Sequence, residues 1–346
     1  GYHKGLQMKP SLIFALFVFF TAFQAHAGDT LNRIKQAGIV RCGARTTANA
    51  FVASNGDGGF KGIDAEICKA IATAVLGRPE AIQIVPVDRG EGDRLLAENK
   101  IDVLLAGNVW SPARELQSEH AFPAIFYHSA LAFIGHYNDA AASMRDYASA
   151  RVCADSQQPF VVKTLREYNT KHRLDLRIMA MPNLSRAKEL LYLKRCDLIL
   201  ERLEILHSDY FKKAPADVDL VVLPEIVRTY ATGPVIRGGD AELFKIVRWL
   251  IRGLIKAEEK GVNAQNIEDF LNTDDPEIKA LLSENQTTAN RLGVDTKWLY
   301  RTIAEQGNYG DIIARGLGEK SDLKLNRGLN KLRRDGGIMD APDFTE

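Results

Sequence analysis

The sequence predicts an α/β protein of two lobes joined by two crossings of the chain. Two observations lead to this fold class: segments of strand character alternate with amphipathic helices, and the same alternation occurs twice along the 346 residues. Strands that alternate with helices form parallel sheets with right-handed crossovers. Because an extended apolar segment separates the two runs, we expect one sheet in each of two lobes.

The first run of alternating elements is expected between residues 38 and 106. Short apolar stretches predict buried strands, and apolar residues at helical spacing predict the helices between them. The strands are expected at 38–44, 81–87 and 101–106, and the helices at 64–77 and 90–99.

The second run repeats this order in the middle of the chain. Its strands are expected at 150–154, 174–181, 196–200 and 218–223, and its helices at 159–170, 184–194 and 201–213. We expect both runs to form parallel sheets, because each strand is followed by a helix long enough to cross over.

Two segments that flank the second run are expected to form the hinge. They are residues 122–137, which are apolar and extended in character, and residues 233–237. From residue 241 onward, apolar residues recur at three and four positions, which predicts a helical extension that packs on the first lobe. The first lobe should therefore comprise 29–132 and 236–346, and the second lobe 133–235.

The segment 8–27 has the pattern of a secretory signal peptide. Lys9 precedes an apolar run that ends on the small-residue pattern Ala-His-Ala at 25–27. The run is too short to span a bilayer comfortably, although an uncleaved anchor is the alternative. We expect cleavage after this pattern and export to the periplasm, with residues 1–7 upstream of the start at Met8.

The charge pattern argues against a nucleic-acid partner. The chain has 45 Lys and Arg against 44 Asp and Glu, and the predicted helices mix both signs on their polar faces. No basic tract is dense enough to follow a phosphate backbone.

Four cysteines remain after the predicted cleavage. An even number in an exported chain favours disulfide bonds over metal or nucleophile roles, and no C-x-x-C spacing is present. Three pairings are open. Cys42 and Cys68 lie on the first strand and the next helix, and Cys153 and Cys196 on two later strands, so pairs within each half are favoured.

The candidate ligand site is expected at the carboxyl ends of the strands, where open α/β sheets bind their ligands. Four loops follow strands that should end at one cleft. Their candidate binding residues are Arg45 and Phe51 in the first loop, Asn108, Trp110 and Arg114 in the second, Ser156, Gln157 and Gln158 in the third, and Glu201 and Arg202 in the fourth.

Motifs along nearly the whole mature chain carry a resemblance. They are IVRCG, GIDAEICKA, NVWSPARE, RVCADS, KRCDLIL, VVLPEI with GPVIR, GNYGDIIARGLG and RGLNKLRRDGGI. With these the sequence resembles the general L-amino-acid-binding proteins of polar amino-acid ABC importers, in solute-binding protein family 3. The resemblance implies a type II periplasmic binding fold with a hinge, which closes on a free amino acid and docks on a membrane permease.

The resemblance also implies roles for single residues. Arg114 matches the arginine that forks onto the ligand α-carboxylate, which a guanidinium can bind with two parallel donors. The alternative is a surface Arg paired with Glu115. Phe51 matches the aromatic that lies over the ligand, with a core position as the alternative, and Trp110 is expected in the cleft wall or the core.

Two further segments match positions that contact the ligand in the family. Asp64 and Glu66 match two acidic positions, although carboxylates in a first helical turn are favoured by the helix dipole anyway, so a structural role is favoured for Asp64. Residues 156–158 replace a Gly-Thr-Thr type segment, where backbone donors at a helix N-terminus could still meet a carboxylate.

The largest departure is at residues 200–202, where relatives carry Thr-Thr-Asp and the Asp receives the ligand ammonium group. Arg202 takes the place of this Asp. Two unit charges about 4 Å apart interact by roughly 4 kcal/mol at an effective dielectric of 20, so this change turns the attraction for the ammonium group into a repulsion of similar size. Glu201 or Glu66 could receive the ammonium instead. Alternatively Arg45, Arg114 and Arg202 form a basic cleft for a dicarboxylate or another anion without the amine, or Arg202 faces solvent.

The function that follows is the solute-binding component of an ABC importer, a monomer without cofactor or metal that binds a small carboxylate, foremost an amino acid. An enzyme resembling dehydratases of cyclic carboxylates is the alternative from another class, with Glu66, Glu201, His120 and His128 as candidates by location only. No P-loop, GxSxG or HExxH pattern supports it. A receptor module that signals after closure would use the same hinge.

Overall fold

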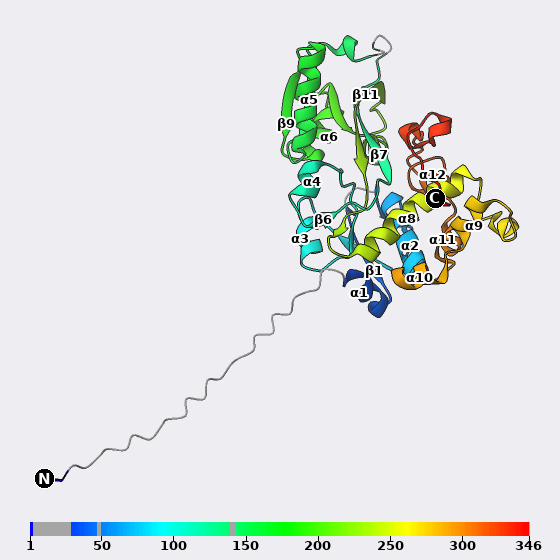
Figure 1. Cartoon of the computed structure of the whole chain (residues 1–346). Helices are drawn as coiled ribbons and strands as arrows, with labels where there is room; N and C mark the ends of the chain where they lie inside the picture. The colour runs from blue at the N-terminus through cyan, green and yellow to red at the C-terminus, as the bar shows by residue number, and fades with distance from the viewer. Residues whose placement is uncertain (3–28, 47–49, 139–140, 142, 346) are drawn as a thin grey trace.

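The chain forms two α/β lobes and a helical C-terminal part that lies against the first lobe (Figure 1). The structure is a computed structural model that describes residues 1–2, 29–46, 50–138, 141 and 143–345, so the predicted signal peptide at 8–27 lies outside the described residues. None of the helices in these ranges is long and apolar enough to cross a membrane.

The first sheet has three parallel strands in the order β4-β1-β5. Each lies within a stretch that the sequence predicted as a strand, and Cys42 of the central strand pairs with Ile84 on one side and Val103 on the other. The elements of this lobe are α1 (Thr30–Ala37), β1 (Val40–Ala44), β2 (Ala53–Ser54), β3 (Phe60–Lys61), α2 (Ile63–Leu76), β4 (Ile82–Pro86), α3 (Gly92–Ala97), β5 (Val103–Leu104), α4 (Pro112–Leu116) and β6 (His120–Ala121).

Helix α2 is the buried helix of the first lobe. Nearly every residue of its first three turns is buried, which agrees with its apolar composition. It begins after Gly62, whose φ is 107°, and a Cβ there would lie 2.4 Å from the carbonyl oxygen of Phe51. Only glycine fits this close approach, so the start of the helix is set by the sequence itself.

The second sheet has five strands in the order β11-β7-β10-β8-β9. Strands β8, β9 and β10 are parallel, whereas β7 runs antiparallel to both β10 and β11, so the sheet is mixed and not wholly parallel as expected. The elements are β7 (Tyr127–His136), β8 (Arg151–Asp155), α5 (Pro159–His172), β9 (Arg177–Met181), α6 (Leu184–Tyr192), β10 (Leu198–Arg202), α7 (Leu203–Ile205) and β11 (Leu220–Thr232).

Three details of this lobe differ from the sequence-based expectation. Residues 127–132, which the sequence assigned to the first lobe, belong to the second sheet because β7 runs unbroken from Tyr127. The helix expected at 201–213 begins only at Leu203, since β10 continues through Arg202. Strand β11 continues to Thr232, past the expected end at 223, because it pairs with the whole of β7.

The two crossings of the chain lie side by side. Thr232 at the end of β11 pairs with Tyr127 at the start of β7, and its hydroxyl donates to the Tyr127 carbonyl at 2.8 Å. The amide of Phe126 donates to the Thr232 carbonyl at 2.7 Å. The chain then returns to the first lobe, where β12 (Ile236–Arg237) pairs with β6. The hinge is therefore a two-stranded antiparallel connection.

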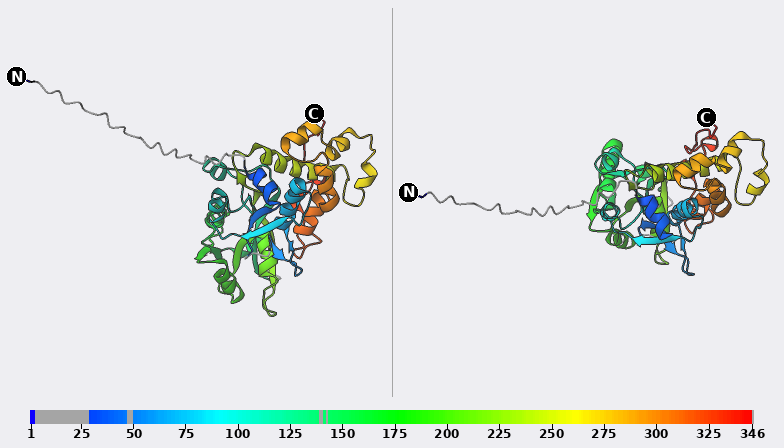
Figure 2. Two further views of the ribbon diagram at one scale, coloured as in Figure 1. Left: turned by 90° about the horizontal axis from the view of Figure 1, so that it is seen from below. Right: turned by 60° about the horizontal axis from the view of Figure 1, so that its bottom comes forward.

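The C-terminal part is a set of helices against one side of the first lobe, where Figure 2 shows them in yellow to orange, and its last segment also contacts β7 of the second lobe. Helices α11 and α12 pack on α2 and α8. Asp240 caps α8 through the amide of Leu243 and also accepts from the amide of Leu31, which ties α1 to α8. The helices are α8 (Ala241–Glu259), α9 (Pro276–Leu282), α10 (Gln286–Leu292), α11 (Trp298–Gln306) and α12 (Tyr309–Gly316).

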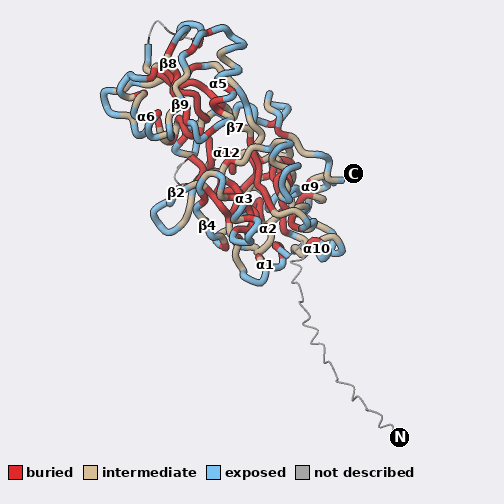
Figure 3. The backbone as a smooth tube through the Cα atoms, turned by 90° about the vertical axis from the view of Figure 1, so that its left-hand side faces the viewer, coloured by how far each residue is buried: buried red, intermediate tan, exposed pale blue. Residues whose placement is uncertain are grey.

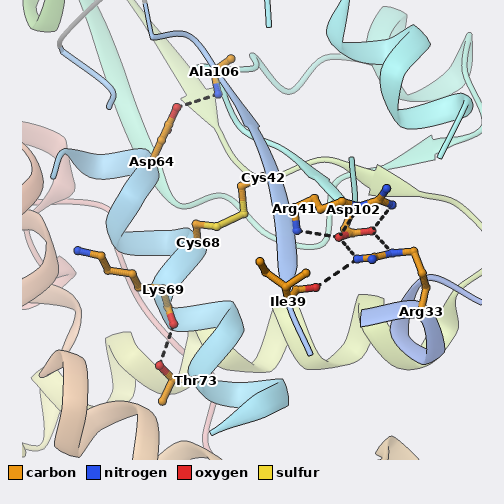
Figure 4. Close-up of a disulfide and its surroundings, with 10 residues drawn as sticks. All are labelled: Arg33, Ile39, Arg41, Cys42, Asp64, Cys68, Lys69, Thr73, Asp102 and Ala106. Carbon is orange, nitrogen blue, oxygen red and sulfur yellow. Dashed lines mark hydrogen bonds and ion pairs between the residues drawn. A yellow bond between two sulfur atoms is a disulfide. The ribbon is translucent and has the colours of Figure 1, made fainter. Parts of the chain in front are cut away.

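Both disulfide bonds close within one half of the chain, which is the pairing that the sequence favoured. Cys42 of β1 is bonded to Cys68 of α2 with a Cα–Cα distance of 6.3 Å, so the bridge ties the buried helix to the central strand (Figure 4). Cys153 of β8 is bonded to Cys196, just before β10, with a Cα–Cα distance of 5.8 Å. All four are buried, and Figure 3 shows that the buried residues, drawn in red, gather inside both lobes.

We expect C42S/C68S and C153S/C196S each to lower the free energy of unfolding by about 3 to 4 kcal/mol, because the bridges close separations of 26 and 43 residues. Guanidinium unfolding of each variant and of the oxidised wild type measures this change. Reduced wild type is the control and should unfold at a lower midpoint than either variant. A variant as stable as the oxidised wild type would show that its bridge does not form.

Candidate ligand-binding cleft

A cavity of about 710 Å³ lies between the lobes, at the carboxyl ends of strands of both sheets. Loops after β1, β4 and β5 form its wall on the first lobe. The start of α5, the end of β10 and part of β11 form the opposite wall. Open α/β sheets bind their ligands at the carboxyl ends of the strands, so the sequence predicted a ligand site at this position.

Cationic side chains outnumber acidic ones in the lining of the cleft. Among the described residues, only Asp88 and Asp93 line it with a carboxylate. A concave site of one charge sign concentrates ligands of the opposite sign, so the cleft is suited to an anion. The cationic residues are Arg45, Arg89, Arg114, Lys163, Arg202 and Arg228.

Arg202 at the end of β10 is the most buried of these cations, with only 5% of its surface exposed. Its Nη1 donates to the carbonyl of Gly107 across the cleft at 3.0 Å, and its guanidinium lies 5.3 Å from the ring centre of Phe160. Its buried Nε has no hydrogen-bond partner in the described part of the chain. A buried donor without a partner is costly, and an anionic ligand would satisfy it. Arg202 therefore faces the cleft and not solvent.

Arg45 at the end of β1 lies near Arg202 in the cleft wall. Its side chain makes no hydrogen bond or ion pair with another described residue. Burial, together with the positive charges of Arg89 and Arg202, lowers its pKa to about 10. Like charges held together in this way favour binding of a counter-ion.

Arg114 in α4 is held by neighbours on the first lobe. Its Nη2 donates to the side-chain oxygen of Asn108 at 2.8 Å and to Asp93 at 2.9 Å. Ser111 caps the helix by accepting from the Arg114 amide. His120, whose Nδ1 lies 3.4 Å from Asp93, holds the pKa of that carboxyl below its ordinary value, assisted by Arg114. These contacts orient the guanidinium but use only one of its nitrogens.

Two carboxylates lie close together at the base of the second lobe. The side-chain amide of Gln158 donates to Glu201 at 2.6 Å and to Asp155 at 3.4 Å. The amide of Gln157 donates to Asp155 at 2.9 Å. Arg89, from the first lobe, approaches Asp155 to 3.2 Å, so this ion pair crosses the cleft. Burial raises the pKa of Glu201.

Curated relatives match almost the whole chain, although no protein-family model matches it. A putative amino-acid ABC transporter-binding protein, YhdW, of Escherichia coli O157:H7 is 31% identical over 97% of this chain and 98% of its own length. The general L-amino acid-binding periplasmic protein AapJ of Rhizobium johnstonii is 31% identical over 97% of this chain and 99% of its own length. The chain belongs to the periplasmic binding proteins of amino-acid ABC transporters.

A solved structure extends this result to the fold. The periplasmic binding protein of an ABC transporter from Brucella ovis, with glutathione bound, has a TM-score of 0.83. It is 29% identical and covers 92% of this chain and 99% of its own. The present chain therefore has the type II periplasmic binding fold that the resemblance of its sequence implied.

Of the ten expected binding residues, six line the cleft, namely Arg45, Asn108, Arg114, Gln157, Gln158 and Arg202. The other four lie elsewhere. Phe51 is fully buried beneath Gly107, so it occupies the core position that was its alternative. Trp110 is 49% exposed and donates to Glu115, so it is in neither the cleft wall nor the core, because α4 turns its ring outward.

Ser156 and Glu201 also lie outside the cleft lining. Ser156 bonds through its amide to the carbonyl of Met181 on β9, and its side chain faces a separate hollow. Glu201 points beneath the cleft surface to Gln158. Glu66, the other candidate for an ammonium group, is paired with Arg315 at 2.7 Å on the far side of α2 and cannot take this part.

Several residues of the cleft lining were not expected from the sequence. Arg89 lies two residues after the strand expected at 81–87, in a loop at its carboxyl end, so the reasoning that selected the other four loops could have found it. Phe160 and Lys163 lie in the first turns of α5, next to the predicted segment 156–158. Arg228 and Tyr230 had no such signal, because β11 was expected to end before them.

We expect D64N to stabilise the protein at neutral pH and above. Burial raises the pKa of Asp64 to about 7, against the opposing effects of the Ala106 amide, Arg45 and Arg202. A raised acid pKa makes stability fall as pH rises from about 4 to about 7. The variant should match wild type near pH 4 and exceed it at pH 8 by at most about 4 kcal/mol. Urea unfolding across this range measures the difference, and a difference independent of pH would contradict it.

Proposed function

We propose that the protein captures a small solute with two acid groups, of the size of an acidic amino acid or a short acidic peptide, and delivers it to an ABC permease. Binding followed by closure of the lobes, and not catalysis, is the proposed role. The single observation that carries the proposal is the position of Arg202: a nearly buried cation with an unsatisfied Nε, beside Arg45, in the wall of the cleft.

The first acid group of the ligand is assigned to Arg45 and Arg202. Guanidinium groups bind carboxylates with paired, charge-assisted hydrogen bonds, which are stronger where water is excluded. The N-terminus of α5 opens into the same cleft and adds the positive end of its helix dipole. An anion here would relieve the repulsion between the two arginines.

The second acid group is assigned to Arg114, as the sequence suggested. The nitrogens that are not bonded to Asp93 and Asn108 are free to donate to a carboxylate. The two arginine sites are neighbours, since Arg202 bonds Gly107 and Arg114 bonds the next residue, Asn108. A ligand with two acid groups a few bonds apart could therefore engage both.

Closure of the lobes follows from the origin of these residues. Arg45 and Arg114 belong to the first lobe and Arg202 to the second, so an anion between them has more partners when the lobes are close together. A ligand shifts a hinge only by its difference in affinity for the two states. The bound glutathione of the Brucella ovis protein carries two carboxylates, which supports a ligand with two acid groups for this chain.

We expect compounds with two carboxylates to bind the mature chain and compounds with one to bind weakly. A thermal-shift screen of mono- and dicarboxylates, with and without amines, gives the ranking, because a ligand at 100 times its Kd adds about 2.7 kcal/mol to stability. R202M should weaken the best ligand at least tenfold by calorimetry. The control is R94M, which removes an exposed Arg of the same charge on α3. Equal loss in both variants would contradict the assignment.

We expect R114A to weaken the best ligand at least tenfold, about 1.4 kcal/mol, with little change in the melting temperature of the unliganded protein. The reason is that Arg114 contributes only part-exposed contacts to Asp93 and Asn108 in the absence of ligand. Calorimetry and thermal unfolding measure the two quantities. A smaller loss of affinity would show that Arg114 is not a carboxylate ligand.

A further inference from the structure

The two carboxylates at the base of the second lobe, Asp155 and Glu201, already have a cationic side chain of the protein beside them. Asp155 and Glu201 are 4% and 1% exposed. Two buried carboxylates in contact with one amide group need positive charge nearby, since a buried charge is tolerated only when it is paired. Arg89 supplies this charge at 3.2 Å from Asp155.

Each of the two carboxylates has partners within the chain. Asp155 accepts from the Gln157 amide and from the Gln158 side chain, and it pairs with Arg89. Glu201 accepts from the Gln158 side chain and from the Arg202 amide. Every one of these partners is a residue of the chain, and Arg89 is the one that comes from the opposite lobe.

A ligand ammonium group beside Asp155 would be repelled by the positive charges that are already there. Arg45, Arg89 and Arg202 act on one another as like charges, and the burial of Arg89 further lowers its pKa. To reach Asp155, a ligand ammonium would have to displace the Arg89 guanidinium and leave it without its partner. Adding a fourth positive group beside three arginines is unfavourable for the same reason that an anion is favourable.

We propose that Arg89 is a specificity-determining residue that takes the place of a ligand ammonium at Asp155 and Glu201, so that the preferred ligand is a dicarboxylate without an α-amine. This inference rests on the proposed function, because it concerns the same cleft and assumes a ligand with two acid groups. It goes beyond that function because it states that, of two dicarboxylates that differ only in an α-amine, the one without the amine binds more tightly.

The experiment compares ligands that differ only in the amine. The probes are succinate with aspartate, glutarate with glutamate, adipate with 2-aminoadipate, and desamino-glutathione, which carries a glutaryl group, with glutathione. Calorimetry on the oxidised mature chain gives the ratio of Kd values within each pair. In wild type we expect the amine-free member of the tightest pair to bind at least tenfold more tightly.

The variant R89M removes the charge of Arg89 and keeps much of its volume. It should reduce the preference for the amine-free member at least tenfold, because an ammonium can then pair with Asp155. R94M is the matched control, since it removes the same charge from an exposed site on the same lobe, and it should leave the ratio within twofold of wild type. Melting temperatures of all variants confirm that they fold.

A second variant tests that the effect passes through Asp155. In R89M/D155N one of the two carboxylates is neutral, so the gain of amine-bearing ligands in R89M should fall at least threefold, a coupling that a double-mutant cycle measures. A wild-type preference for the amine, or an unchanged ratio in R89M, would overturn the role of Arg89 and leave the dicarboxylate site intact. Absence of binding of all eight probes to wild type would overturn the proposed function and this inference together.

Discussion

The cleft depends on the pairing of the two chain crossings with each other. Tyr127 and Thr232 form the last pair of β7 and β11, and the amide of Phe126 extends the pairing by one hydrogen bond. Strands joined in this way can twist and bend but cannot slide apart without breaking their backbone bonds. The lobes therefore keep their register along the hinge, and the same strand ends face each other however far the lobes open.

The C-terminal part adds a second set of bonds at the root of the hinge. Tyr309 of α12 donates to the carbonyl of Phe126 at 2.7 Å. Asn330 binds both backbone groups of His128, accepting from the amide at 2.6 Å and donating to the carbonyl at 3.0 Å. These residues bind the first residues of β7 as a neighbouring strand would. The C-terminal part thus ties the start of β7 to the first lobe.

Opposing charges act across the cleft between the lobes. Arg45 of the first lobe and Arg202 of the second repel each other, whereas Arg89 and Asp155 attract. The attraction favours approach of the lobes, and the repulsion opposes it until an anion lies between the two arginines. An anion between the two arginines removes this repulsion and shifts the population toward the closed state by as much as it binds that state more tightly.

The sequence predicted the lobes, the strands of the first sheet and the cysteine pairing, because these depend on local periodicity and on chain order. The length of strand β11 was underestimated because residues 224–232 are stabilised by pairing with β7 and not by their own apolar pattern. Among the site residues, positions just after a strand were accessible to sequence reasoning. The outward orientation of Trp110 was not, since it depends on the short helix α4 and its contact with Glu115.

The end of β10 shows how one error in an element boundary changes the chemistry expected of a site. Had a helix begun at residue 201, Glu201 and Arg202 could both have faced the ligand. In a strand, successive side chains point to opposite faces, so Arg202 enters the cleft while Glu201 points beneath it to Gln158. The adjacent strand end matches this arrangement. Gly107 has a φ of 64°, which favours glycine, and a Cβ there would lie 2.6 Å from the Arg202 Nη1, so the glycine leaves room for the guanidinium.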